Sequence, residues 1–245
     1  MVIVSHSLPR EYLSYIQAKG HQTVVLPPDP RLPAPVASHP DMLLFLTQNT
    51  LITDCTYYEE IAQEELDKIC FIGHLKLELT NETPGISYPE DIRFNALPLG
   101  RYLFCHPTHT SQAILTMAKD AHITRITTRQ GYARCAACPI GENALITADP
   151  SITSKAKENG LDVCVIRQGH ILLPGYPYGF IGGCCGTTKD HIFFCGDPSL
   201  HPDGAKMLSF IQSKGITPHW ISGLPLFDTG SLFFISEHNL QQSIF

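Results

Sequence analysis

The chain has 245 residues, a length sufficient for one large domain or two small ones. Hydrophobic residues make up 43% and charged residues 16%, a composition too apolar for a disordered protein. Its formal net charge is -6, and no cluster of lysine and arginine offsets it, so we expect no surface that follows nucleic-acid phosphates. No apolar stretch is long enough to cross a membrane, and residues 1–10 lack the basic start and apolar run of a signal peptide, so we expect neither.

A short signature follows an apolar run at four places along the chain: Asp54-Cys55-Thr56, His106-Pro107-Thr108, Asp149-Pro150-Ser151 and Asp197-Pro198-Ser199. The four sites lie 52, 43 and 48 residues apart, and the last is 48 residues from the end of the sequence. Such near-equal spacing indicates internal repeats. We therefore predict a single domain of five α/β units, approximately 1–54, 55–106, 107–149, 150–197 and 198–245.

Each signature is typical of a helix start. An aspartate oxygen can accept hydrogen bonds from the first helical turn, and proline fits the next position because its missing N–H has no helical partner. The predicted helices, in chain order, are 11–18, 59–67, 111–119, 154–158 and 203–213. Three of them are followed by Gly20, Gly160 and Gly215, where a helix commonly ends in a left-handed turn.

Two kinds of short strand alternate with these helices. A β-rich run follows most of them, at 24–26, 125–127, 163–166 and 219–221, and an apolar run closes each unit, at 42–46, 102–105, 144–147, 191–194 and 232–235. This alternation predicts an α/β fold. An ordinary doubly wound sheet would alternate in the same way, but the spacing and the repeated caps favour a ring. The proline-rich segment 27–35 predicts a stiff surface loop.

The nine cysteines, an odd number, lie mostly inside apolar runs, for example Cys70, Cys105, Cys164 and Cys195. A free cysteine behaves as a small hydrophobic residue and is often buried. This distribution favours a reducing compartment over a disulfide framework, and we predict a cytoplasmic protein.

Five α/β units of this length in a ring resemble the pentein superfamily, and within it an uncharacterised family of that fold. The superfamily contains arginine deiminases, dimethylarginine hydrolases and amidinotransferases, which modify guanidino groups, and a non-enzymatic initiation factor that binds the ribosome. The resemblance implies a five-unit α/β propeller with a small-molecule site in its central channel, at the inner ends of the strands. It implies no cofactor and no metal.

One residue of each unit stands just before the closing apolar run and is expected at this channel: Asp41, Asn95, Cys135, Gly183 and Asp228. Carboxylates could bind a guanidinium through paired, charge-assisted hydrogen bonds. We therefore predict a ligand that carries a guanidino, amidino or amide-like group.

The catalytic residues predicted on this basis are Cys135 as nucleophile, His39 as proton donor and acceptor, and Asp41. Arg134, or the charge of the ligand, would lower the pKa of the thiol. The predicted substrate-binding residues are Asn95, Asp228, Arg134, Gly183 and Cys184. The pattern departs from that of the superfamily's enzymes, which usually carry the nucleophilic cysteine in the last unit and the His-x-acid motif in mid-chain. Here the last unit has Asp228-Thr229-Gly230-Ser231, and His39-Pro40-Asp41 lies in the first.

Each of these residues also has a purely structural interpretation. Asp41 could cap a turn, His39 could simply lie in a loop, and Cys135 could be a buried thiol that only packs. Asn95 and Asp228 could form hydrogen bonds to the backbone at the ends of strands. The pair Cys135 and Cys138 has the spacing of half a zinc site, with Cys184 and Cys185 to complete it, or of a redox pair. The glycine-rich stretch 179–186 predicts either a tight hairpin or a loop that contacts a ligand, and His201-Pro202-Asp203 predicts the start of a helix.

Two functions follow from these patterns. The first is a cysteine-dependent hydrolase or transferase that acts on non-peptide C–N bonds of a small cationic compound. The second is a module of the same fold that binds a ligand or a protein without catalysis, which the missing cysteine in the last unit favours.

Overall fold

Five three-stranded sheets make up the β structure of residues 1–235, which are the residues that the computed structural model describes. In each sheet the middle strand pairs antiparallel with one neighbour and parallel with the other. The sheets are β15 (Phe233–Phe234), β1 (Val2–Ser5) and β2 (Thr23–Leu26); β3 (Leu44–Leu46), β4 (Thr50–Asp54) and β5 (Lys76–Thr80); β6 (Leu97–Leu99), β7 (Tyr102–Cys105) and β8 (Thr124–Thr127); β9 (Ala137–Ile140), β10 (Ala144–Thr147) and β11 (Asp162–Val165); and β12 (Cys185–Thr187), β13 (His191–Phe194) and β14 (Thr217–His219).

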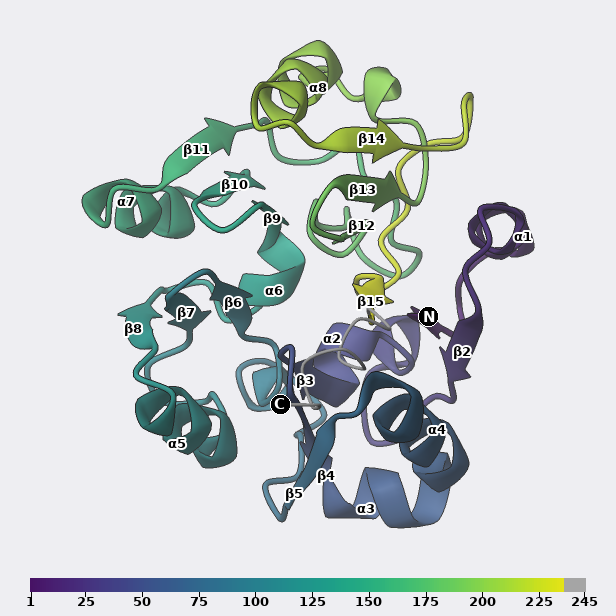
Figure 1. The fold of residues 1–245 in the computed structure, drawn as a ribbon, viewed down its shortest axis with the longest axis vertical. Coiled ribbons are helices and arrows are strands. Elements are labelled where there is room, and N and C mark those ends of the chain that lie inside the picture. Colours follow the sequence, from purple (N-terminus) through teal and green to yellow (C-terminus); the bar gives the residue numbers. More distant parts are fainter. Residues whose placement is uncertain (236–245) are drawn as a thin grey trace, which may run out of the picture.

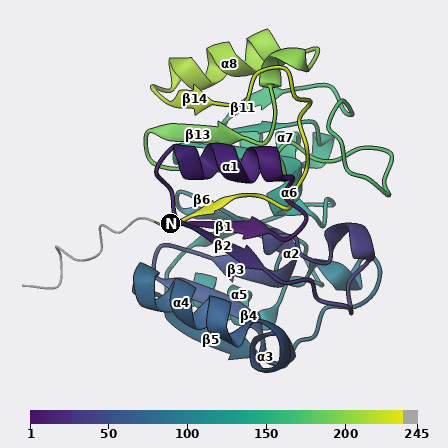
Figure 2. The same cartoon turned by 90° about the vertical axis from the view of Figure 1, so that its right-hand side faces the viewer.

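Within each sheet, helical structure connects the middle strand to its parallel neighbour, as parallel pairing requires. These connections are α1 (Arg10–Ala18); α3 (Cys55–Tyr57), a π-helical turn (Tyr58–Ala62) and α4 (Gln63–Gly73); α5 (Gln112–Asp120); α7 (Pro150–Glu158); and a 3-10 turn (Pro198–Leu200) with α8 (Gly204–Ser213). The sheets follow one another around the middle of the molecule with these helices outside (Figure 1), and the side view shows α1, α4 and α8 along its outer face (Figure 2). The β structure is thus five small sheets rather than one continuous doubly wound sheet.

The sheet formed by β15, β1 and β2 joins the two ends of the described chain. Strand β15 pairs antiparallel with β1, so that Phe234 lies opposite Val2. The sheets are therefore offset from the sequence intervals: each cap signature lies between a middle strand and its helix, and the last interval, 198–245, extends beyond the described residues.

Three of the four predicted caps form as expected. Asp54 accepts a hydrogen bond from the backbone of Tyr57 and Asp149 from Ile152, while Asp197 caps the 3-10 turn that precedes α8. The prediction at His106 is wrong, because α5 begins later and is capped by Ser111. Histidine lacks the short side-chain oxygen of a helix cap, and the Ser111 hydroxyl provides it.

Two further expectations need correction. The predicted strand 42–46 is divided between the short helix α2 (Pro40–Leu43) and β3, and a matching helix, α6 (Ala133–Ala136), immediately precedes β9. The segment 27–35 is not simply a surface loop: Asp29 is fully buried, and Arg31 bridges Asp29 and Asp54 with 2.6 Å ion pairs. No helix of the described chain is long and apolar enough to cross a membrane.

Candidate functional site

The two short helices α2 and α6 bring Asp41 and Cys135 together in the interior. The Cys135 Sγ atom lies 3.0 Å from Asp41 Oδ2 and 3.0 Å from Asn95 Nδ2. Gly183 donates its backbone N–H to the Cys135 carbonyl, and its own carbonyl accepts from Thr229 and Ser231, beside Asp228. All five residues that precede the closing runs in sequence therefore belong to one connected network.

Asn95 connects the two helices through both ends of its amide group. Its Oδ1 accepts hydrogen bonds from the backbone N–H groups of Arg134 and Cys135, at 2.9 and 3.3 Å. Its Nδ2 donates to the Asp41 carbonyl at 3.1 Å as well as to the thiol. Because these groups belong to α2 and α6, Asn95 fixes how Cys135 faces Asp41.

Asp41 is fully buried, and only one of its two carboxylate oxygens accepts hydrogen bonds from residues 1–235. Its Oδ2 accepts hydrogen bonds from the Ser231 hydroxyl, at 2.7 Å, and from the Cys135 thiol. Within residues 1–235 its Oδ1 has no hydrogen-bond partner, and no basic side chain pairs with it. A buried carboxylate without a counter-charge is costly, which suits this oxygen to a cationic ligand.

Asp228 is the second buried carboxylate of the site. Its oxygens accept backbone hydrogen bonds from Phe180, at 2.8 Å, and Gly230, at 3.0 Å, and the His39 Nδ1 atom lies 3.9 Å away. Burial raises the pKa of Asp228 above its ordinary value; His39 opposes this shift and the charge of Asp41 adds to it. Two carboxylates that disfavour each other's charge would both gain from a bound cation.

The thiol of Cys135 is not activated in the free protein. Burial raises its pKa well above the ordinary value, and the charges of Asp41 and Asp228 raise it further. The expectation that Arg134 would lower this pKa is wrong. The Arg134 side chain lines a different cavity, with its guanidinium 5.2 Å from the centre of the Phe233 ring.

A cavity of about 190 Å³ opens onto this network. Its polar lining is Cys135, His39 and Asp228, and its walls are mostly aromatic or aliphatic, with Val36, Met42, Tyr132, Leu173, Tyr176, Pro177, Tyr178 and Phe180. Among these lining residues no lysine or arginine occurs. Neither the aromatic walls nor the role of Ser231 was predicted from the sequence. The run Tyr176-Pro177-Tyr178-Gly179-Phe180 could have indicated these walls, because it places three aromatic residues beside proline and glycine, which interrupt strands.

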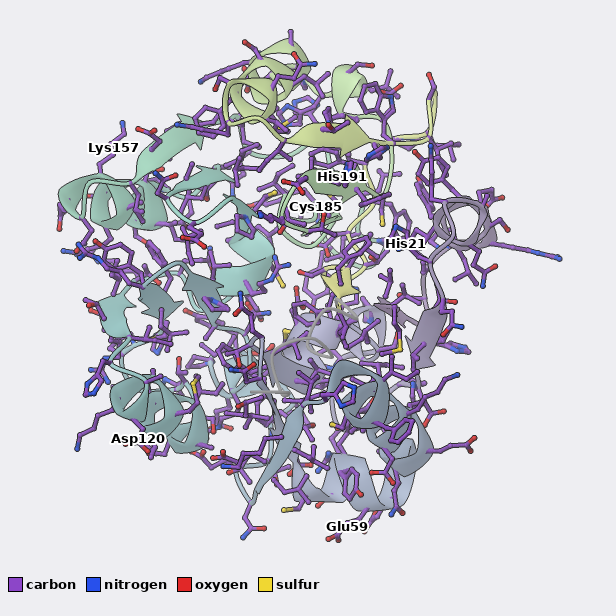
Figure 3. All side chains as sticks on the ribbon, viewed as in Figure 1. His21, Glu59, Asp120, Lys157, Cys185 and His191 are labelled. Atoms are coloured by element: carbon purple, nitrogen blue, oxygen red, sulfur yellow. The ribbon has the colours of Figure 1, made fainter. Side chains whose placement is uncertain are left out.

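Cys184 does not belong to this cavity. Its side chain lies in a hydrophobic core with Cys138, Cys164 and Cys185, and its thiol donates to the Ile181 carbonyl at 3.2 Å. Figure 3 shows Cys185 well inside the molecule, whereas Glu59, Asp120 and Lys157 lie at its rim. All nine cysteines are free thiols, and within residues 1–235 no group of three or more His, Cys, Asp or Glu side chains is placed to hold a metal ion.

The glycine-rich stretch allows the close approach of Asp228. A Cβ atom at Gly183 would overlap both carboxylate oxygens of that side chain. We expect Gly183→Ala to destabilise the protein by about 1–3 kcal/mol, because the overlap forces Asp228 or the backbone to move. We also expect it to weaken ligand binding at the cavity.

Chemical denaturation and ligand titration would measure both effects. Gly141→Ala is the matched control: its added Cβ meets open space, but φ at Gly141 is 65°, so only backbone strain is added. The control should lose stability without losing binding. Unchanged ligand affinity in the Gly183→Ala protein would show that ligand binding does not depend on the position of Asp228.

Solved structures with the same fold include guanidino-group enzymes. DDAH from Pseudomonas aeruginosa, a cysteine-to-serine variant complexed with citrulline, is 12% identical with a TM-score of 0.55, over 90% of this chain and 91% of that chain. An amidinotransferase of saxitoxin biosynthesis from Microseira wollei is 13% identical with a TM-score of 0.57, over 96% of this chain and 81% of that one. A dimethylarginine dimethylaminohydrolase adduct with S-methyl-L-thiocitrulline is 11% identical with a TM-score of 0.55, over 90% and 91%.

These similarities confirm the predicted resemblance to the pentein superfamily at the level of the fold. A search of curated protein sequences gives no match. A family model matches residues 3–233, which is nearly the whole described chain. The chain therefore belongs to the Family of unknown function (DUF6873).

Proposed function

We propose that this protein is a thiol-dependent hydrolase or transferase for a small guanidino or amidino compound, with its five sheets arranged as a five-unit α/β propeller and the ligand held in the 190 Å³ cavity. The observation that carries the proposal is the Oδ1 of the buried Asp41, which has no hydrogen-bond partner in the described part of the chain and lies beside Cys135, within the same network as Asp228. The solved structures of similar fold include an amidinotransferase, and a dimethylarginine dimethylaminohydrolase bound as an adduct with S-methyl-L-thiocitrulline, whose side chain ends in an isothiourea.

A planar cation suits the two carboxylates. Asp228 already accepts two backbone hydrogen bonds, and Asp41 keeps one oxygen without a partner. A guanidinium or amidinium presents several N–H donors in one plane, and in the cavity it would meet Asp228 directly, whereas the fully buried Asp41, which is not among the lining residues, would attract it through its charge. Its charge would relieve the repulsion between them.

The same cation would activate the nucleophile. Asp41 and Asp228 both raise the pKa of Cys135, so neutralising them would lower that pKa when the ligand binds. The thiolate would attack the amidino carbon and form a C–S bond, and the C–N bond to the leaving amine would break. His39, whose Nε2 has no partner among the described residues, would accept the proton released by the thiol, deliver it to that amine, and then activate water or an acceptor amine, whose attack would break the C–S bond and restore the thiol.

The side chains that line the cavity indicate what the rest of the ligand is like beyond its cationic group. Tyr132, Tyr176, Tyr178 and Phe180 line it, and aromatic faces attract cations and apolar groups. No lysine or arginine lines the cavity to receive a carboxylate of the ligand. We therefore propose a guanidine or amidine whose remaining part is uncharged and apolar rather than an amino acid.

A non-catalytic binding module remains the second candidate, and one observation favours it. The thiol of Cys135 has a raised pKa and two hydrogen-bond partners, as expected of a structural cysteine. For either function we propose a reducing, cytoplasmic location, supported by nine free thiols.

Benzamidine tests the choice of ligand, because benzamide has nearly the same shape without the charge. We expect benzamidine to raise the melting temperature in proportion to the logarithm of its concentration, since a ligand that binds only the native state stabilises it by about RT ln(1 + [L]/Kd). Benzamide should raise it much less. Equal shifts would show that the site does not select for charge, and no shift with either compound would count against the proposed class.

A further inference from the structure

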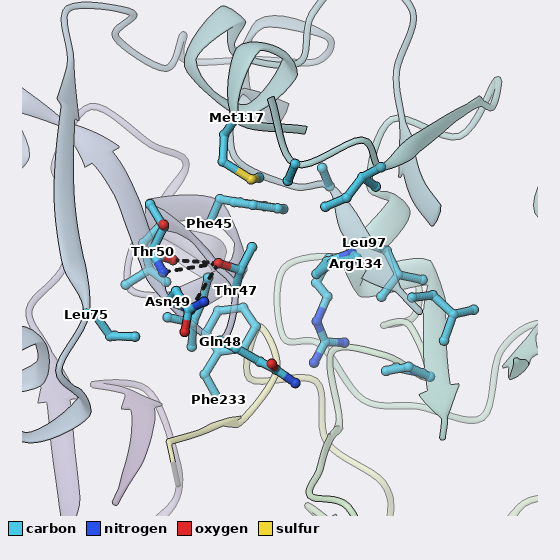
Figure 4. A pocket seen from close by; sticks show the side chains of 18 of the residues that line it. Phe45, Thr47, Gln48, Asn49, Thr50, Leu75, Leu97, Met117, Arg134 and Phe233 are labelled. Carbon is cyan, nitrogen blue, oxygen red and sulfur yellow. Dashed lines mark hydrogen bonds between the residues drawn. The ribbon is translucent and has the colours of Figure 1, made fainter. Parts of the chain in front are cut away.

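A second and larger cavity, of about 1150 Å³, has no part in the proposed function. Its lining includes Arg134, Phe233, Leu97 and Phe45, and Figure 4 shows the Arg134 side chain extending into it. Cys135, the next residue, lines the smaller cavity. Neighbouring residues of α6 thus serve two different cavities.

Arg134 is a buried cation without a counter-charge in residues 1–235. Its exposed fraction is 5%, no acidic side chain of that range pairs with it, and its Nη1 has no hydrogen-bond partner. The face of Phe233 is its nearest favourable contact. A cation–π contact compensates only part of the cost of removing a guanidinium from water.

The backbone of Arg134 is held in place on both sides of the peptide unit. Asn95 Oδ1 accepts the hydrogen bond of the Arg134 N–H at 2.9 Å, and the Arg134 carbonyl lies against Gly182, where any Cβ would overlap it. The guanidinium that extends from this position provides a planar set of donors for a carboxylate.

The surroundings of Arg134 distinguish it from the lysine and the other arginine of the cavity wall, which also carries Glu78, Asp120 and Glu142. Lys76 pairs with Glu78 at 3.3 Å, and Arg101 donates to the Tyr102 hydroxyl at 2.8 Å. The side chains drawn near Arg134, by contrast, include Leu97 and Phe233 (Figure 4). A ligand that reaches Arg134 would therefore bury an apolar body together with its charge.

We propose that this cavity binds a small organic carboxylate, with the carboxylate on Arg134 and an apolar body against Leu97, Phe45 and Phe233. The inference is independent of the proposed function, because it uses neither of the two buried carboxylates of the candidate site. It assigns Arg134 to an anion, whereas Asp41 and Asp228 are suited to a cation.

Calorimetric titration of the full chain with octanoate tests the assignment, with octanamide as the uncharged probe of similar shape. We expect octanoate to bind and octanamide to bind at least about tenfold more weakly, since a hydrogen-bonded charge pair is worth more than a neutral one. Arg134→Gln should lose about 10- to 100-fold in octanoate affinity. Arg101→Gln, on the same cavity wall, should bind like the parent protein.

Arg134→Lys keeps the charge without the planar donors, and we expect it to bind octanoate with intermediate affinity. This second variant keeps the proposal testable if the Arg134→Gln protein does not fold. Equal affinities for octanoate and octanamide, no binding of octanoate, or unchanged binding in both Arg134 variants would each overturn the proposal.

Discussion

Asp41→Asn is expected to weaken the binding of an amidinium ligand by about 10- to 100-fold while leaving the free protein at least as stable as its parent. Asparagine can place its oxygen where Asp41 Oδ2 accepts from Ser231 and Cys135. Its amide nitrogen then takes the position of Oδ1, which has no partner among the described residues. The change removes a buried charge, which lowers the cost of folding, and it also removes the attraction for a cation.

Benzamidine titration and thermal denaturation measure the two effects separately. Asp29→Asn is the matched control, because Asp29 is also fully buried but pairs with Arg31. The control should lose stability and keep its affinity for benzamidine. If Asp41→Asn instead destabilised the protein and left the affinity unchanged, Asp41 would be a structural residue.

Cys135→Ser is expected to reduce turnover of an amidino substrate by at least about a thousandfold, with binding changed only a few-fold, because a hydroxyl can keep the hydrogen bond to Asp41 but is a far weaker nucleophile. A substrate found by the benzamidine comparison would provide the assay. Single-turnover kinetics and equilibrium titration would measure the two quantities.

Cys138→Ser is the control for this experiment, since Cys138 has the same residue type three positions away but lies in a hydrophobic core. The Cys138→Ser substitution should lower the free energy of unfolding, and the protein that stays folded should turn over substrate as fast as the parent. Full turnover by the Cys135→Ser protein would exclude Cys135 as the nucleophile. Binding without turnover in the parent protein would favour the non-catalytic module.

The position of the site was predictable because it follows from repetition. Asp41, Asn95, Cys135 and Asp228 each precede the closing run of a unit, and repeated units place equivalent positions at equivalent ends of their strands. The caps at Asp54, Asp149 and Asp197 were predictable for a related reason, since a cap depends on local hydrogen bonds only.

The direction of individual side chains was not predictable from sequence. Arg134 and Cys135 are adjacent, yet a helical turn directs them to different cavities. Cys184 follows Gly183 but turns into the core. The raised pKa of Cys135 depends on Asp41 and Asp228, which are distant in sequence, and so it required the tertiary structure.

The most direct test of the account is the rate at which Cys135 reacts with chloroacetamidine compared with chloroacetamide, mapped by peptide mass spectrometry at neutral pH. The two reagents share a leaving group and a shape, but only the first carries the amidinium charge. We expect chloroacetamidine to modify Cys135 at least about tenfold faster, and we expect Asp41→Asn to remove the difference, because the carboxylates both bind the cation and set the pKa of the thiol. Equal rates with the two reagents, or preferential modification of another cysteine, would contradict a cation site built around Cys135.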